Sequence, residues 1–355
     1  MPHRFLIVRT SAIGDVVMTS ALPAALRRQY PDAHIAWLVE PGIHELLTPD
    51  PNLDEVILWP KQGWRTLWRE GRKLELLRQV WQFRRQLRAR RFDTALDLQG
   101  LMKSGFLAWL SGAPRRVGLG SKEGSQWLMT EVVARDGEPR ELMSSEYQHF
   151  AQAIGLEAAT FHPNLTISPA AELAALARLN QHQLVPGGYA VVAPFTTRPQ
   201  KHWFKDHWQR LLPQLADGTG LRPVILGGPD DAEAAQRLAA ADPRTVNLAG
   251  QTRLAEAVAL VARSALLVGV DTGLTHMGTA LNRPTVAIFG STCPYQRTGR
   301  PNGRVIWLGL ACSPCRRRPS CGGEFGCLRA ITPEHVLREV HAVLAITPTP
   351  PRAKT

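Results

Sequence analysis

The sequence predicts an α/β protein made of two doubly wound domains, each built around a parallel sheet. The chain has 355 residues, which exceeds the size at which a single hydrophobic core usually stops growing. Short apolar, β-branched runs alternate with segments of helical periodicity along the chain, as is typical of βα units. A segment containing proline and glycine, from about residue 161 to residue 188, separates two such series.

Eleven short segments are predicted to be strands. The first series comprises residues 4–10, 33–40, 54–59, 94–100 and 115–119, and the second comprises residues 189–195, 222–228, 246–250, 265–270, 284–290 and 304–310. We therefore expect an N-terminal domain over residues 1–170 and a C-terminal domain over residues 171–346. The final segment, 347–355, reads "TPTPPRAKT" and is expected to be a disordered tail.

The composition is that of an ordinary soluble globular protein, with 44% hydrophobic and 20% charged residues. No apolar run approaches the roughly 18 residues that a membrane-spanning helix needs. The first apolar stretch, "FLIV", is too short for a secretory signal. We therefore expect a cytoplasmic protein.

Positive charge is concentrated in the first half of the chain. The formal net charge is +12, and residues 61–116 contain 14 lysines and arginines against 4 acidic residues. Such a surface favours an anionic partner, which leaves nucleic acid, a phosphorylated glycolipid and an acidic membrane as alternatives.

Large apolar side chains recur near helical spacing among the arginines of residues 63–92. These side chains are Trp64, Trp68, Leu74, Leu77 and Trp81. An ordinary helix with a solvated basic face explains the pattern. The alternative is a helix that rests on anionic lipid, with indoles at the interface and arginines on phosphates.

Ligands of open α/β sheets bind beyond the carboxyl ends of the strands, so the loops after the strands are the candidate sites. The first such loop, "TSAIGD", contains Gly14, where backbone can approach a ligand closely, and Asp15 at a helix start. Asp15 is either a cap of that helix or a general base. The loop lacks the G-x-G-x-x-G dinucleotide fingerprint, which argues against a dehydrogenase.

The loop after residues 189–195 carries two hydroxyls and an amine. Thr196, Thr197 and Lys201 are suited to phosphate oxygens, although a solvated surface loop would have the same composition.

The loop after residues 265–270 reads "DTGLTH". Asp271, Thr272 and Gly273 open a helix whose first N–H groups can receive an anion without a metal. His276 lies one turn further, where a histidine packed on a helix face is the plainer interpretation.

Four cysteines, Cys312, Cys315, Cys321 and Cys327, lie within 16 residues. A reducing cytoplasm argues against disulfides, and structural zinc stays an open alternative because the spacing is not that of a standard finger.

The motifs "SAIGD", "TTRPQKHW", "DTGLTH" with "ALNRPT", and the cysteine block resemble those of the ADP-heptose:lipopolysaccharide heptosyltransferases, from about Arg4 to Val340. The resemblance implies a GT-B fold, with two Rossmann-like domains and a cleft between them. It implies an enzyme that transfers heptose from ADP-heptose to Kdo or heptose of the lipopolysaccharide inner core, with inversion at the anomeric carbon.

The resemblance also implies roles for individual residues. Asp15 matches the catalytic base, Lys201 matches a lysine on the donor phosphates, and Thr196 and Thr197 match hydroxyls of the donor pocket. Asp271, Thr272, Gly273 and His276 match the loop that holds the diphosphate and the sugar. On the acceptor side we expect Gly14 and Lys103, which follows the strand at 94–100.

The chain has no Asp-x-Asp, so we expect a metal-independent reaction without a cofactor. The expected setting is the cytoplasmic face of the inner membrane of a Gram-negative bacterium, where a monomer contacts anionic lipid peripherally. A transferase with another sugar or acceptor is the alternative. A nucleic-acid-binding protein is disfavoured because no recognisable motif is present.

Overall fold

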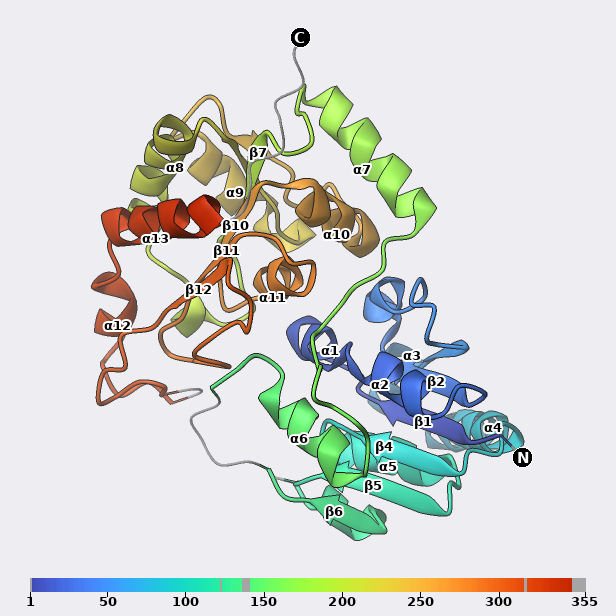
Figure 1. The fold of residues 1–355 in the computed structure, drawn as a ribbon. Coiled ribbons are helices and arrows are strands. Elements are labelled where there is room, and N and C mark those ends of the chain that lie inside the picture. The colour runs from blue at the N-terminus through green and yellow to red at the C-terminus, as the bar shows by residue number, and fades with distance from the viewer. Residues whose placement is uncertain (1, 122, 136–140, 316–317, 347–355) are drawn as a thin grey trace. The chain divides into compact units, whose positions relative to one another are not determined.

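The computed structural model describes residues 2–121, 123–135, 141–315 and 318–346 (Figure 1). The predicted tail, 347–355, lies outside the described residues. The chain forms two compact units, one of Met1–Glu138 and Ser144–His162, the other of Pro139–Met143 and Pro163–Thr355. Each unit contains one six-stranded parallel sheet, which confirms the predicted α/β class with two sheets.

The sheet of the first unit has the strand order β3-β2-β1-β4-β5-β6. Its strands are β1 (Arg4–Val8), β2 (His34–Val39), β3 (Glu55–Leu58), β4 (Thr94–Asp97), β5 (Arg115–Leu119) and β6 (Glu131–Val133). The helices of this unit are α1 (Ile13–Thr19), α2 (Leu22–Gln29), η1 (Pro41–Leu46), α3 (Lys61–Arg69), α4 (Lys73–Ala89), α5 (Met102–Leu110), η2 (Ser125–Leu128) and α6 (Ser145–Ala153).

The sheet of the second unit has the order β12-β11-β10-β7-β8-β9. Its strands are β7 (Tyr189–Ala193), β8 (Arg222–Ile225), β9 (Val246–Asn247), β10 (Leu266–Val270), β11 (Thr285–Ile288) and β12 (Gly303–Ile306). Its helices are α7 (Pro169–Gln181), η3 (Pro199–Lys201), α8 (Lys205–Thr219), η4 (Pro229–Asp231), α9 (Ala232–Ala239), α10 (Leu254–Arg263), α11 (Gly273–Ala280), α12 (Gly326–Arg329) and α13 (Pro333–Ile346).

All eleven predicted strands are present, and one strand was not predicted. The missed strand, β6, is only three residues long, and Val132 at its centre is 51% exposed. An exposed edge strand has no continuous apolar run, so its sequence carries little signal. The basic segment predicted as one helix is two, α3 and α4, separated at Gly71, which adopts a φ of +71° that favours glycine.

Helices cover both faces of the second sheet, as expected for a doubly wound fold. One face packs against α8 and α13 through a core that includes Trp208 and Val340, and the other packs against α7 and α10. Strands β1, β7 and β10 are almost entirely buried, which explains why they read as unbroken apolar runs.

Both sheets have the strand order of a dinucleotide-binding α/β domain, in which the winding direction reverses at one place. The reversal falls between β1 and β4 in the first unit and between β7 and β10 in the second. Loops that follow these strands diverge and leave a crevice where ligands bind in such folds. The candidate residues of the sequence lie in these four loops or at the start of the helices that follow them. Within the described ranges, no helix is both long and apolar enough to span a bilayer.

Gly269 is predicted to be intolerant of a side chain. It lies in β10 beside Ala193 of β7, and an added Cβ would overlap Thr275 Oγ1 and lie 2.8 Å from the Ala193 Cβ. We expect Gly269→Ala to reduce the free energy of unfolding by about 2 kcal/mol, because an overpacked core must shift to relieve the overlap. The measurement is urea unfolding of the variant beside wild type.

Gly326→Ala is the matched control in the same unit. A Cβ at Gly326 would meet nothing within 4 Å, so its unfolding free energy should stay within about 0.5 kcal/mol of wild type. Equal stability of the two variants would contradict the packing argument.

Candidate functional site

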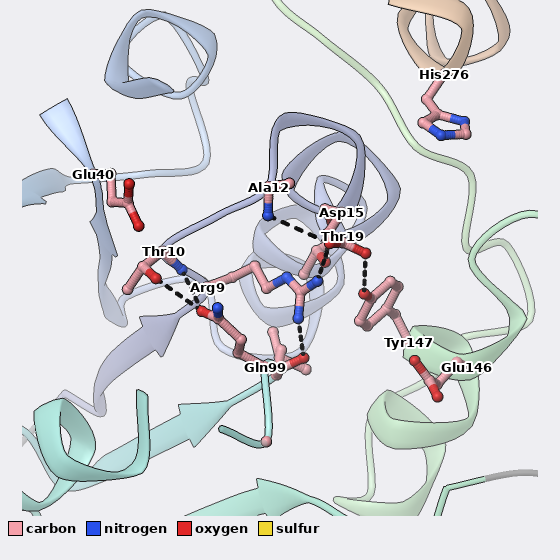
Figure 2. A network of polar contacts seen from close by, with 12 residues as sticks. Arg9, Thr10, Ala12, Asp15, Thr19, Glu40, Gln99, Glu146, Tyr147 and His276 are labelled. Carbon is pink, nitrogen blue, oxygen red and sulfur yellow. Dashed lines mark hydrogen bonds and ion pairs between the residues drawn. The ribbon is translucent and has the colours of Figure 1, made fainter. Parts of the chain in front are cut away.

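An ion pair between Arg9 and Asp15 occupies the reversal point of the first unit (Figure 2). Arg9 directly follows β1, and Asp15 is the third residue of α1. Arg9 Nη2 lies 2.6 Å from Asp15 Oδ2, with side chains that are 7% and 36% exposed, respectively. The carboxylate is therefore the partner that reaches solvent. Gly14, beside it, is partly exposed in the first turn of α1.

The carboxylate of Asp15 has further contacts. The Ala12 N–H donates to Oδ2 over 3.3 Å, so Asp15 does cap its own helix, as the plainer interpretation predicted. Tyr147 Oη, from α6, lies 3.5 Å from Oδ1, a distance that makes a weak hydrogen bond. These contacts fix the orientation of a carboxylate that stays partly exposed.

Arg9 is buried and could not be identified as a site residue from the sequence. Its Nη1 donates to the Leu98 carbonyl over 2.9 Å, and its guanidinium lies 5.8 Å from the Tyr147 ring centroid. Burial lowers the pKa of Arg9, but the charge of Asp15 and its hydrogen bond outweigh burial and hold that pKa above its ordinary value. The only sequence signal is an arginine at the very end of an apolar strand.

A hydrogen-bonded bridge joins the loops after β1 and β4. Gln99 Oε1 accepts from the backbone N–H and the hydroxyl of Thr10, over 3.1 and 2.9 Å (Figure 2). Asp97 Oδ1 accepts from the Gln99 N–H over 3.0 Å, and burial raises the pKa of Asp97. Trp37, fully buried in β2, donates from its indole N–H to the Arg9 carbonyl. The sheet core therefore supports the Arg9–Asp15 pair directly.

Lys103 forms part of a second charged cluster in this unit. Lys61 Nζ and Lys103 Nζ lie 2.9 and 3.9 Å from Glu40 Oε1, and both ammonium groups lie within 6 Å of the Trp59 ring centroid. Burial, followed by the charge of Lys61, lowers the pKa of Lys103, whereas Glu40 acts in the opposite direction. Two ammonium groups against one carboxylate leave an excess positive charge. Sequence reasoning found Lys103 and missed Lys61.

The reversal point of the second unit carries another ion pair, between Lys201 and Asp271. Lys201 Nζ lies 2.6 Å from Asp271 Oδ2, with side chains that are 17% and 10% exposed. Thr196 Oγ1 donates to the Asp271 carbonyl over 3.2 Å, so the loops after β7 and β10 are joined. Here the ammonium is the more exposed partner.

Both carboxylate oxygens of Asp271 have hydrogen-bond or ion-pair partners. His276 Nε2 lies 3.3 Å from Oδ1, and the Thr292 hydroxyl donates to Oδ2. Burial would raise the pKa of Asp271, but the His276 hydrogen bond and the charge of Lys201 more than compensate and hold that pKa well below its usual range. The carboxylate is therefore fixed as an anion.

His276 is 3% exposed, so it is a buried, packed histidine, as the plainer interpretation predicted. Its Nδ1 lies 2.9 Å from Tyr295 Oη, and burial raises the pKa of Tyr295, which keeps that hydroxyl protonated. In a neutral imidazole, Nε2–H would donate to Asp271 and Nδ1 would accept from Tyr295. The histidine therefore holds Asp271 rather than facing solvent.

The other residues predicted for the donor side are Thr197, Thr272 and Gly273, which lie close in sequence to Lys201 or Asp271. Thr272 precedes α11 as its N-cap residue, with partly exposed Gly273 as the first helical residue. The first N–H groups of a helix have no partner within the helix and attract anions. Thr197 is exposed in the loop after β7.

Two members of the cysteine block, Cys315 and Cys327, lie near Ser291 and Gly290, which follow β11. Cys327 is 5% exposed, and Cys315 Sγ is 3.9 Å from the Ser291 carbonyl. Burial, reinforced by neighbouring thiols, raises the pKa of both Cys315 and Cys327. Among residues 2–121, 123–135, 141–315 and 318–346, no group of three or more His, Cys, Asp or Glu side chains is arranged to hold a metal ion.

Asp271→Asn should destabilise the protein, because it leaves Lys201 without its carboxylate in a largely buried position. We expect a loss of about 3 kcal/mol at pH 7. The folded-state pKa of Asp271 is depressed, so its contribution is complete above the unfolded value of about 3.9 and is lost as pH falls through the folded value. The difference between wild type and variant should therefore be constant from pH 7 to 5 and shrink below about pH 4.

Urea unfolding at several pH values measures this difference. Asp230→Asn, which removes an exposed carboxylate of the same unit, is the control and should stay within about 0.5 kcal/mol of wild type. A difference that grows on acidification would contradict the assignment.

Comparison with known proteins identifies the family. The model of "Glycosyltransferase family 9 (heptosyltransferase)" matches residues 80–324. Lipopolysaccharide heptosyltransferase 1 of Escherichia coli O18:K1:H7 is 31% identical, over 82% of this chain and 87% of the relative. Lipopolysaccharide heptosyltransferase 2 of Escherichia coli K12 is 30% identical, over 96% of this chain and 98% of the relative.

The fold agrees with these matches. The E. coli heptosyltransferase WaaC, solved with ADP-2-deoxy-2-fluoro heptose, superposes with a TM-score of 0.72 at 26% identity, covering 95% of this chain and 99% of that one. This similarity confirms the expected GT-B fold class. The chain therefore belongs to glycosyltransferase family 9, the heptosyltransferase family.

Proposed function

We propose that the protein is an inverting glycosyltransferase that moves heptose from ADP-heptose to Kdo or heptose of the lipopolysaccharide inner core. One observation carries the proposal: a chain similar over most of its length to lipopolysaccharide heptosyltransferases has a partly exposed carboxylate at one reversal point and an ammonium at the other. On this proposal residues 1–170 bind the acceptor and residues 171–346 bind the donor. The ligand of the E. coli WaaC structure, an ADP-heptose analogue, supports the donor assignment.

Asp15 is the proposed catalytic base. Its carboxylate removes the proton of the acceptor hydroxyl, the oxygen attacks the anomeric carbon of the heptose, and ADP leaves from the opposite side with the bonding electrons. Inversion follows from this single displacement. Arg9 is a positioning residue, because it holds Oδ2 while the carboxylate stays 36% exposed.

Lys201 and the start of α11 are the proposed stabilisers of the ADP leaving group. An ammonium and unpaired N–H groups both attract the negative charge that develops on the diphosphate. Thr196, Thr197, Thr272 and Gly273 complete the donor pocket in this proposal.

Asp271 and His276 act through Lys201 rather than on the phosphates. A buried carboxylate in contact with a diphosphate would repel it, whereas its ion pair with Lys201 fixes the ammonium in place. His276 in turn fixes Asp271. This assignment changes the expected role of both residues from donor contact to positioning of the donor-binding lysine.

Lys103, with Lys61 and Gly14, is proposed to meet the acceptor. The excess positive charge around Glu40 suits the carboxylate of an acidic sugar or a core phosphate. Glu40 itself is attached to the Asp15 loop, since its N–H donates to the Thr10 carbonyl over 3.1 Å. The acidic group of the acceptor would then bind close to the base.

The reaction is proposed to need no metal, because Lys201 and the α11 amides supply the positive charge that an Asp-x-Asp-bound cation supplies elsewhere. We further propose that the protein is a monomer on the cytoplasmic face of the inner membrane of a Gram-negative bacterium, where its lipid-linked acceptor is made. Nucleic acid has no part in this function.

The direct test is incubation with ADP-heptose and a panel of truncated core acceptors that end in Kdo or in heptose, read by mass. We expect one heptose to be added to one member of the panel, with the same rate in EDTA. Lack of transfer to every member would reject the function. Loss of activity in EDTA with recovery in Mg²⁺ or Mn²⁺ would reject the metal-free mechanism alone.

Substitutions of Asp15 and Lys201 should separate acceptor chemistry from donor binding. Asp15→Asn should lower kcat by about 10³-fold and leave the Kd for ADP within a few-fold, because the base acts on the acceptor. Lys201→Ala should raise the Kd for ADP by about tenfold, since it removes a charge-assisted contact. Steady-state kinetics and calorimetric titration of ADP measure the two effects.

Lys205→Ala removes a nearby exposed lysine and should change neither value. A kcat close to wild type in Asp15→Asn would show that another group is the base. An unchanged Kd in Lys201→Ala would remove this lysine from the donor site.

A further inference from the structure

The α3–α4 hairpin exposes four large apolar side chains. These residues, the exposed apolar face, are Trp68, Leu74, Leu77 and Trp81, with exposed fractions of 64%, 75%, 63% and 56%. Single exposed apolar residues are normal on a protein surface, but neighbouring groups of them mark an interaction site.

The hairpin does not use this face to pack on its own domain. Leu67 in α3 and Phe83 and Leu87 in α4 are the buried residues of the two helices, at 5%, 6% and 0% exposure. At 100° per residue, Leu74, Leu77 and Trp81 fall on the side of α4 opposite Phe83 and Leu87. The hairpin thus has two apolar faces, and only one of them is explained by the core.

Basic residues border the exposed apolar face. Lys73 Nζ lies 5.8 Å from the Trp68 ring centroid, and the Arg85 guanidinium lies 4.9 Å from that of Trp81. Arg78 and Arg85 fall on the same side of α4 as Trp81. Other exposed basic residues of the hairpin are Arg65, Arg69 and Arg88.

Lys61 and Arg90 pair with Glu40 and Glu55 outside the hairpin, and the acidic residues of the hairpin leave most of the remaining positive charge uncompensated. Residues 61–90 contain ten lysines and arginines and two acidic residues, Glu70 and Glu75. Both glutamates pair with Arg72, at 3.0 and 2.5 Å. The surface around the exposed apolar face is therefore strongly positive.

We propose that the exposed apolar face and its basic border dock on an anionic phospholipid bilayer. Indole and leucine side chains enter the interface between headgroups and acyl chains, while arginine and lysine contact lipid phosphates. This inference rests on the proposed function, because a lipid-linked acceptor gives the docked enzyme its substrate in the same membrane. The charge complementarity selects anionic lipid over a neutral apolar partner.

The test is sedimentation of the full-length protein with vesicles of phosphatidylglycerol and phosphatidylcholine, beside vesicles of phosphatidylcholine alone. We expect binding to the anionic vesicles that weakens in high salt. The variant Trp68→Ser/Leu74→Ser/Leu77→Ser/Trp81→Ser should partition at least tenfold less. Arg85→Glu should also reduce binding, by about tenfold, since it reverses one charge near the surface.

Two matched controls carry the same chemical changes elsewhere. Trp127→Ser removes an 84% exposed indole outside the hairpin, and Arg338→Glu reverses an exposed charge of the second unit. Both should partition within about twofold of wild type. Thermal unfolding checks that the fourfold variant is folded. If that variant is unfolded, Arg85→Glu still tests the proposal.

A second readout separates this inference from the proposed function. The fourfold variant should transfer heptose to a water-soluble delipidated acceptor as fast as wild type, and lose turnover only on acceptor embedded in vesicles. Failure of wild type to transfer heptose to either acceptor would reject the function while the vesicle assay still judges docking. Absent vesicle binding by wild type, with a face-dependent change in oligomeric state or in duplex DNA binding, would overturn the inference.

Discussion

Each site depends on one constraint, the reversal of winding direction within a parallel sheet. Since β1 lies beside β4, and β7 beside β10, residues about 90 and 75 positions apart meet at the strand ends. Each meeting point is occupied by a cation–carboxylate pair, Arg9–Asp15 in one unit and Lys201–Asp271 in the other. The sheet core supports the first pair through the Trp37 indole, and the hydroxyl of Thr196 joins the loops around the second. The Lys201–Asp271 pair joins the two loops of its unit, whereas the Arg9–Asp15 pair lies within the segment after β1 and is held to the loop after β4 by the Leu98 carbonyl.

The two pairs have the same components and opposite accessibility. Arg9 is the buried partner of Asp15, so the group presented to a ligand is a carboxylate, which suits proton removal from an alcohol. Asp271 is the more buried partner of Lys201, so the group presented is an ammonium, which suits a diphosphate. A buried charge with a fixed counterion can hold its partner without competing for the ligand. Burial therefore supports the two proposed roles, which residue type alone leaves open.

The sequence was sufficient for the strands and for the residues that follow them, because both are local signals. Buried parallel strands read as apolar runs, and among the strands that the structure describes only β6, which is short and exposed, gave no such signal. The residues that contact these candidate side chains could not be predicted in this way. Tyr147 contacts Asp15 although the two residues are 132 positions apart. Lys61 and Lys103 both contact the carboxylate of Glu40, which follows a third strand, β2. The fixed position of Asp271 is likewise not predictable from "DTGLTH" alone, because it also depends on contacts with Lys201 and Thr292, which lie outside that stretch.

The α3–α4 hairpin shows the same limit for hydrophobic periodicity. Trp64 and Trp68 are one turn apart in α3 and look alike in sequence. Trp64 packs edge-on against Trp59 and Phe83, with ring centroids 6.2 and 5.6 Å apart, whereas Trp68 lies 64% exposed. The break at Gly71 ends α3 and starts α4 as a separate helix, and each helix then places part of its apolar surface outward. Within α4 alone, Leu74, Leu77 and Trp81 lie opposite the buried Phe83 and Leu87, so this helix carries a second apolar face that a single core-facing stripe would not give.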